Sequence, residues 1–578
     1  MKSDKLSLTQ IIIINLVLIL FLFGFVPVIL DLIEIGNRII VISVLGNFLI
    51  LFLVVVLIVD FILLVVNRMN YQFLSMLNMI LTLLLYILFI YSFLNNIFEI
   101  VYVMTYSNSA LPLIYRIVFI WAGEHGSILT WMVFNSIIIY LYRIKNKYKE
   151  DLIFRRSVIL SLFISVVFLI ILFSMNPFEV DLTPAFVNGN PSLDPSLDPK
   201  PILMSPFMIW HPFFTFIAYA IFLIPFTITI AQITTRNSKL MNSYVQDFYN
   251  FSVKFGWLVL TLSIGLGAYW AKIALNWGRY WGWDPVETVS LIPWLMCTAF
   301  FHTIIFKKKN PNLIKLNIGL VFLSIIYSTL VTRGGISPIH SFTGTTELII
   351  WTALVGFLLT IGSLYVIYVV LDYLLEEYRN KKLLFDYLSY LFLFGIAFIC
   401  VFGLFITPLT NILSNYFTVD EIYIGPDFYI IINLILAFGL AVTLIFCSIW
   451  ENFEHKVIIL IIILGLSAQS VLSFSLLSIS GVWINPIIFI YFMAIFSSAY
   501  KFAKNLEVKK GIAYFFRLNS KTIIHSGISF ILVGTITPSI FEIFQDIFFI
   551  TGFILLLVGI IPSIMRSIIP KKNSYNYF

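Results

Sequence analysis

Tryptophans crowd one short segment of this sequence. Residues 277–287 read WGRYWGWDPVE, and the segment with its flanks holds Trp270, Trp277, Tyr280, Trp281, Trp283 and Trp294. Large flat rings gathered in this way favour a platform for a large planar apolar ligand. The simpler alternative is an aromatic belt at a membrane surface, but a belt is usually spread over many helix ends. The crowding therefore favours a binding platform.

Four of the six histidines could hold an iron porphyrin in two pairs. His211 and His340 are expected on the outer membrane face with the tryptophans, where two imidazoles could approach an iron from opposite sides. His302 and His525 are expected within apolar spans, each roughly 6 Å from the inner end at 1.5 Å per residue. Two imidazoles at one depth could clamp a haem in the bilayer. Taken singly, each histidine is better explained by an interfacial or interhelical hydrogen bond, whereas the matched depths of His302 and His525 favour ligation.

Two carboxylates follow the tryptophans and have the layout of a helix start. Asp284 would be the N-cap, Pro285 the first helical residue, and Glu287 would close a capping box. The alternative is an acid–base pair turned toward a substrate. The spacing favours capping.

The elements that position these residues must be membrane helices. The chain of 578 residues is 61% hydrophobic and 11% charged, with a mean hydropathy of +1.02. A span needs roughly 20 apolar helical residues, and such runs recur along nearly the whole chain. We predict an all-α polytopic integral membrane protein with roughly 15 to 16 spans. Candidate spans begin near Ile11, Ile39, Phe73, Ser127, Ser157, Phe213, Val253, Val289, Leu313, Leu348, Leu388, Phe428, Val457, Trp483, Lys521 and Ile547.

Basic loops set the expected orientation. Residues 143–156, 307–315, 376–383, 501–511 and 569–573 are rich in Lys and Arg and fall on one side when the spans alternate, so that side is the inside. The net charge of +7 thus reflects topology and gives no support to nucleic-acid binding. The first apolar run is expected to be a retained span, because no small-residue cleavage site follows it.

Four segments then fall outside: 96–126, 175–211, 276–288 and 333–347. Within the first, Pro112–Gly123 is too short to span and is expected at the interface. The second repeats PSLDP, which favours an exposed linker over a substrate-contacting segment.

Other chemistries find little support. Cys297, Cys400 and Cys447 stand singly in apolar runs, so neither a c-type cytochrome nor a dithiol oxidoreductase is indicated. An ion pump would carry a chain of charged residues through mid-membrane, whereas Asp60 and Lys272 lie toward span ends. Phosphate-binding glycine loops are absent from the sequence.

The sequence resembles the CcmF family, the large subunit with the WWD tryptophan motif in the cytochrome c haem lyase. The similar segments are YSNSALPLIYRIVFIWAGEHGSILTW (106–131), residues 188–214, LGAYWAKIALNWGRYWGWDPVETVSLIPWL (266–295) with His302 just beyond, STLVTRGGISPIHSF (328–342) and IIHSGISFILVG (523–534). They cover the central half of the chain and one late span. The tryptophan segment alone would mark only the wider haem-handling superfamily.

The resemblance implies two haems. His211 and His340 would ligate a haem b in transit over the tryptophan segment, and His302 and His525 a resident haem b that keeps the delivered iron reduced. Covalent attachment joins the haem to two cysteines of a CxxCH apocytochrome, and the residues expected to promote it are His211, His340, Trp277, Trp281, Trp283 and Asp284. Trp270, Arg279 and Arg333 are expected haem contacts, although Arg279 could equally anchor to lipid headgroups.

Two departures from the family pattern stand out. Gly278, Arg279 and Tyr280 occupy positions where the family usually has two glycines and another tryptophan, so the ring packing is expected to differ. Glu124 and His125 stand in reversed order, which leaves the role of His125 open.

Three regions are expected: N-terminal helices (1–98), a haem-handling core (99–347), and a C-terminal bundle carrying His525 (348–578). Expected partners are haem, apocytochrome c, a haem chaperone, other maturation subunits and membrane lipid. The expected site is a bacterial cytoplasmic or mitochondrial inner membrane, with the tryptophan segment on the periplasmic or intermembrane-space side. The alternative is a haem carrier or exporter without lyase activity, which would not need His302, His525 or the long C-terminal bundle.

Overall fold

The computed structural model describes residues 38–568 apart from breaks at 68–71, 145–150, 183–203, 236–241, 275–277, 307–309, 335–345, 378–380, 450–453, 477–484, 506–511 and 538–541. The expected first span, Trp277, His340 and the PSLDP repeat lie outside the described residues. The chain forms two compact units, Met1–Gln246 and Asp247–Phe578. This division does not bear on the three functional regions expected from the sequence, which remain a prediction.

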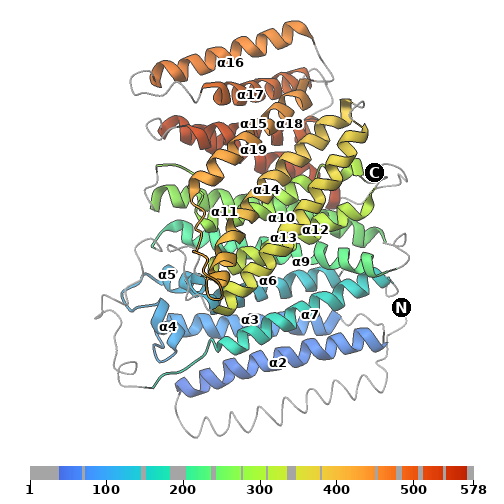
Figure 1. Ribbon diagram of the computed structural model, residues 1–578. Coiled ribbons are helices and arrows are strands. Elements are labelled where there is room, and N and C mark those ends of the chain that lie inside the picture. Colours follow the sequence, from blue (N-terminus) through green and yellow to red (C-terminus); the bar gives the residue numbers. More distant parts are fainter. Residues whose placement is uncertain are drawn as a thin grey trace. The chain divides into compact units, whose positions relative to one another are not determined.

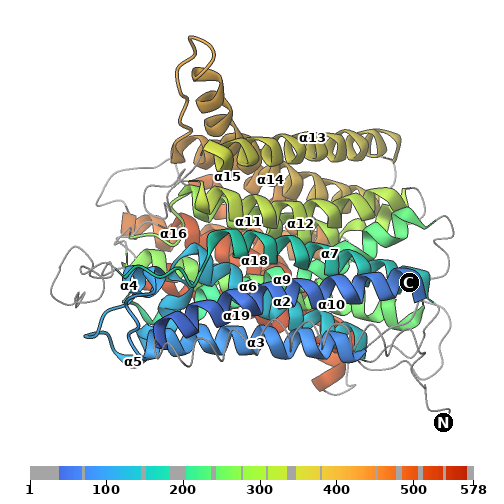
Figure 2. The same ribbon diagram turned by 90° about the horizontal axis from the view of Figure 1, so that it is seen from below.

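The first unit is a bundle of long helices with short ones at one end (Figures 1 and 2). Helix α6 packs against α3, α7 and α9, while α2 packs against α3 and α7. The helices are α2 (Arg38–Asn67), α3 (Gln72–Leu94), α4 (Val101–Tyr106), α5 (Leu113–Val118), the 3-10 helix η1 (Phe119–Ala122), α6 (Glu124–Ile144), α7 (Leu152–Met175) and α9 (Pro206–Thr234).

A buried ion pair joins two helices of this unit. Arg143 of α6 and Asp60 of α2 form a bidentate pair, and their side chains are 0% and 1% exposed. A buried charge is tolerated only when it is paired and hydrogen-bonded. The pair therefore fixes the register of α2 against α6.

The short helices are held by one tyrosine hydroxyl. Tyr102 of α4 donates to the Ile120 carbonyl at 2.8 Å and accepts from the Gly123 and Gly126 amides. A Cβ at Gly126 would lie 1.7 Å from the Ile120 oxygen, so only glycine fits where the chain enters α6. Leu113 and Ile114 of α5 are exposed, as suits the expected interfacial stretch.

The second unit carries the tryptophan segment and the two expected membrane-buried histidines. Its helices are α10 (Ser243–Ala274), which begins at the end of the first unit, α11 (Pro285–Phe300), the 3-10 helix η6 (Thr303–Phe306), α12 (Pro311–Arg333), α13 (Thr346–Glu377), α14 (Lys381–Ser414), α15 (Pro426–Ile449), α16 (His455–Leu476), α17 (Asn485–Asn505), α18 (Ile512–Ile536) and α19 (Glu542–Ile568).

Glycines bring α18 and α19 into backbone contact (Figure 1). A Cβ on Gly527 would lie 2.8 Å from the Gly552 carbonyl oxygen, and a Cβ on Gly552 would lie 2.7 Å from that of Gly527. Small residues at matching positions let membrane helices approach this closely. The helix that carries His525 is thereby held firmly against α19.

An all-α integral membrane protein is confirmed, and the described residues contain 12 helices long and apolar enough to cross a membrane. Of the sixteen expected spans, one precedes the described residues. The runs near Val289 and Val457 form shorter apolar helices, Pro285–Phe300 and His455–Ser470. The run near Lys521 forms α18, whose first half carries Arg517, Asn519, Lys521 and His525, and these polar side chains lower its hydropathy.

Candidate functional site

The tryptophan segment forms a tight loop that leads into α11. Gly278 and Trp283 both adopt left-handed backbone conformations, with φ of 63° and 59°. The Asp284 side chain accepts a hydrogen bond of 2.8 Å from the Val286 amide, and Pro285 opens the helix. The predicted capping role of Asp284 is therefore confirmed. A left-handed tryptophan is strained, so surrounding contacts must hold it.

Glu287 lies in the first turn of α11, before the expected span, and turns back toward the loop. Its Oε2 accepts a hydrogen bond of 2.8 Å from the Gly282 amide. Burial raises the pKa of this carboxyl to about 8, while the bond from Gly282 opposes the rise. Glu287 thus ties helix to loop, much as the capping box predicted.

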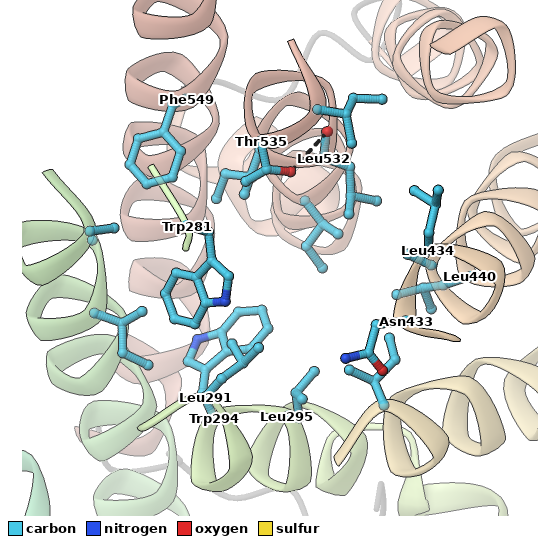
Figure 3. Close-up of a pocket in the computed structure, with 18 of the residues that line it drawn as sticks. Trp281, Leu291, Trp294, Leu295, Asn433, Leu434, Leu440, Leu532, Thr535 and Phe549 are labelled. Atoms are coloured by element: carbon cyan, nitrogen blue, oxygen red, sulfur yellow. Dashed lines mark hydrogen bonds between the residues drawn. The ribbon is translucent and has the colours of Figure 1, made fainter. Parts of the chain in front are cut away.

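Beneath the loop lies an apolar cavity of about 530 Å³. Figure 3 shows the indoles of Trp281 and Trp294 on one side and Asn433 on the other. Trp283 and the exposed Arg279 also line it, and the remaining wall comes from α10, α14, α15, α17, α18 and α19. Its volume falls within the roughly 300–1,000 Å³ of small-molecule and cofactor sites.

Three polar atoms on lining side chains are buried without a hydrogen-bond partner among the described residues. They are Trp281 Nε1, Asn433 Oδ1 and Tyr491 OH. By contrast, Trp294 Nε1 donates to Thr261 Oγ1 at 2.8 Å. Buried polar atoms are normally paired. Three unpaired ones around a single cavity indicate a ligand site with a few polar contacts.

His302 and His525 do not line the cavity, but two of its lining residues lie near them in sequence. Ile528, three residues after His525 in α18, lines it, as does Leu295, which precedes His302 along α11. His302 lies just after α11, and its Nδ1 is 3.2 Å from the Thr298 carbonyl oxygen. The two imidazoles lie close enough to interact electrostatically, and Lys521 acts on both. The fold therefore brings together two histidines that are more than two hundred positions apart.

The remaining expected residues are scattered. His211 lies in the second turn of α9 in the first unit, half-buried, and its expected partner His340 lies outside the described residues, so their pairing remains a prediction. Trp270 is half-buried near the end of α10. Arg333 is buried at the end of α12, and its Nη1 donates to the Thr329 carbonyl at 3.4 Å.

Several lining residues are not among those expected from the sequence. Asn433 could have been noticed, because it is an amide in the apolar run FYIIINLILAFG. Tyr491 and Phe549 carry no such mark, since aromatic residues are common in membrane helices. Only the packing of distant helices makes them part of this site.

Residues 121–333 match a family model described as "Cytochrome C assembly protein". The fold is that of a polytopic membrane protein, and this part of the chain is similar to cytochrome c assembly proteins. The cytochrome c-type biogenesis protein CcmF of Escherichia coli (strain K12) is 30% identical over 263 residues, which are 44% of this chain and 39% of that relative. The biogenesis protein NrfE of Haemophilus influenzae is 31% identical over 261 residues, again 44% and 39%.

A solved structure of a cytochrome c heme lyase CcmF matches 86% of this chain and 77% of that one, with a TM-score of 0.60 and 18% identity. This likeness concerns the fold. The central part of the chain is thus similar in sequence to CcmF proteins. The match spans about two-fifths of the length of these curated relatives.

Proposed function

We propose that this protein is a haem lyase subunit that holds haem at the outer membrane face and promotes its covalent attachment to CxxCH apocytochrome c. The observation that carries the proposal is the apolar cavity lined by Trp281 and Trp283, in the same unit that brings His302 close to His525. A simple carrier would need the tryptophan end alone.

The residues present fit a haem. Its flat apolar ring suits walls of indole and aliphatic side chains. Its carboxylates need a cation at the edge, and Arg279 is exposed there. The unpaired Trp281 N–H adds a hydrogen-bond donor within the cavity. Together these residues would bind the ring and fix which edge faces outward.

A resident haem would be held by His302 and His525. His525 lies on α18, which is packed tightly against α19, and His302 lies in the turn after α11, where its Nδ1 is 3.2 Å from the Thr298 carbonyl oxygen. Bound iron supplies one-electron chemistry there. The surrounding charges of Lys521 and Asp386 would tune it. We propose that this site keeps the delivered iron reduced.

Attachment requires little chemistry from the chain itself. Haem supplies two vinyl groups, and each cysteine S–H of the peptide adds across one of them, so no oxidant is consumed. Cys297 and Cys400 are buried, and none of the three cysteines forms a CxxC pair, so the chain's own thiols take no part. Its residues hold the ring, orient it and exclude water. His211 and His340 are proposed as the outer ligands, one of which yields to the peptide histidine.

The remaining assignments follow from this function. We place the tryptophan loop on the periplasmic or intermembrane-space side of a bacterial cytoplasmic or mitochondrial inner membrane. A haem chaperone would deliver the haem, and other maturation subunits would present the apocytochrome.

Spectroscopy of the purified protein tests the resident haem. Reduced-minus-oxidised spectra should show a b-type haem in the wild type that is lost in His302→Ala and in His525→Ala. Retention of the spectrum in both variants would refute the buried site.

Cytochrome maturation tests the outer site. His211→Ala and His340→Ala should abolish the yield of a co-expressed CxxCH cytochrome while leaving the resident spectrum intact. Normal yield in both would contradict the assignment. A carrier without lyase activity would bind haem but yield no attached cytochrome in any reconstituted mixture.

A further inference from the structure

Tyr280 is the residue of the tryptophan loop that turns away from the cavity into the bundle. It is fully buried, whereas its neighbour Trp281 lines the cavity. Its ring stacks on Phe549 of α19 with centroids 3.8 Å apart and planes 9° apart. Phe549 itself lines the cavity. One face of Phe549 therefore supports the loop, and the residue also forms part of the cavity wall.

The Tyr280 hydroxyl donates a hydrogen bond to a charged side chain. It donates to Asp546 Oδ1 at 2.6 Å, one turn before Phe549 on α19. Hydrogen bonds to an ionised acceptor are roughly twice as strong as neutral ones. The contact is therefore well suited to holding a strained loop in one place.

Lys272 fixes the carboxylate in turn. Its ammonium pairs with the same Asp546 oxygen, lies 3.2 Å from Glu542 Oε1, and sits 4.8 Å from the Tyr280 ring centroid. The Lys272 side chain is only 5% exposed. A cation so buried needs these carboxylates, which means that Asp546 is itself restrained.

These contacts join three parts of the second unit: the end of α10, the tryptophan loop and the start of α19. We propose that Asp546 is a positioning residue, which holds Tyr280 and so fixes Trp281 and Trp283 over the cavity. The inference rests on the proposed function only for its effect on haem.

Amide hydrogen exchange of the full chain in detergent tests the anchor without haem. Tyr280→Phe removes one oxygen and keeps the ring, and Asp546→Asn removes the charge. In both, peptides covering 278–288 should exchange on the order of tenfold faster than in wild type, because a charge-assisted bond is lost. Tyr423→Phe and Asp420→Asn, which alter exposed residues of the outer loop 415–425, are matched controls. Exchange no faster than in these controls would overturn the proposal.

Haem titration tests the consequence. Tyr280→Phe should shift the Soret maximum of haem added to the cavity beneath the tryptophan loop and weaken the binding of that haem several-fold. The spectrum of the resident haem should stay unchanged. The double variant Tyr280→Phe/Asp546→Asn should bind haem no more weakly than whichever single variant has the lower affinity. Independent, additive losses would overturn the proposal. If the wild type takes up no haem in the cavity, the proposed function fails, whereas the exchange data still decide the anchor.

Discussion

Trp283 and Tyr429 stack with their rings 5.9 Å apart and only 7° from parallel. The contact ties a tryptophan in a left-handed conformation to the first turn of α15. Trp281 meets Trp283 edge-on at 6.2 Å, so the stack also supports the indole that lines the cavity. Position 429 therefore matters for the loop although it lies far from it in sequence.

Removing this stack should loosen the loop. Tyr429→Ala is expected to weaken haem binding in the cavity beneath the tryptophan loop by roughly two- to tenfold, which corresponds to the free energy of one aromatic pair. Tyr429→Phe keeps the ring and should bind as the wild type does. Haem titration followed by tryptophan quenching measures both. Equal weakening in the two variants would show that the hydroxyl, not the stack, supports the loop.

Stability should depend on pH through Glu287. Its pKa is raised to about 8, above the value of about 4.3 for an unfolded chain. The folded state therefore holds this proton more tightly, and the resulting stability is full below about 4.3 and lost as the pH rises through about 8. The melting temperature should fall from pH 5 to pH 9 more steeply in the wild type than in Glu287→Gln. Identical slopes would contradict this assignment.

The charge of Lys521 should raise the midpoint potential of the resident haem, because a nearby cation favours the reduced iron. Lys521 acts on both His302 and His525 and lies 3.9 Å from Asp386. Lys521→Gln should lower the potential by on the order of tens of millivolts, and Asp386→Asn should raise it. Lys456→Gln, an exposed lysine on α16, is the control. Potentiometric titration that gives shifts of the opposite sign would rule out this role.

The buried pair in the first unit offers a stability test. Arg143→Leu strands the Asp60 carboxylate and should cost about 3–5 kcal/mol of unfolding free energy. The double variant Asp60→Leu/Arg143→Leu leaves no lone charge and should regain much of the lost free energy of unfolding. Thermal unfolding in detergent compares the two. A double variant less stable than Arg143→Leu would mean that the pair itself, and not the stranded charge, dominates.

Backbone contact between α18 and α19 should tolerate no side chain. Gly552→Ala places a Cβ 2.7 Å from the Gly527 oxygen and the Ile531 nitrogen, so the helices must separate. We expect a lower melting temperature and a weakened resident haem spectrum. Gly319→Ala on α12, where no atom lies within 4 Å, should be neutral or slightly stabilising. Equal behaviour of the two variants would disprove the close packing.

Hydropathy predicted most of the helices, because a span must be long and apolar whatever its neighbours are. It missed the low hydropathy of α18, which carries the buried Asn519 and His525 as well as the exposed Arg517 and Lys521. The start of α11 was predictable from Asp284, Pro285 and Glu287, since capping depends on a few adjacent residues.

The cavity was less predictable. Its tryptophans could be recognised because they crowd into one short segment. The pairing of His302 with His525, which do not line it, was suggested by their equal expected depths. Phe549 and Tyr491, which line it, and Tyr429, which stacks on Trp283, could not be singled out, because aromatic residues are common in membrane helices and only tertiary packing selects these three. The outer pair His211 and His340 remains a prediction from family resemblance.

The glycine contact between α18 and α19 also determines how force would travel through the second unit. Helix α19 carries Asp546 and Phe549 beneath the loop, and its backbone touches the helix that carries His525. Where Gly527 faces Gly552, no compressible side chain separates the two helices. A push on the loop by an arriving peptide would therefore be transmitted by this stiff pair to His525, the proposed ligand of the resident haem.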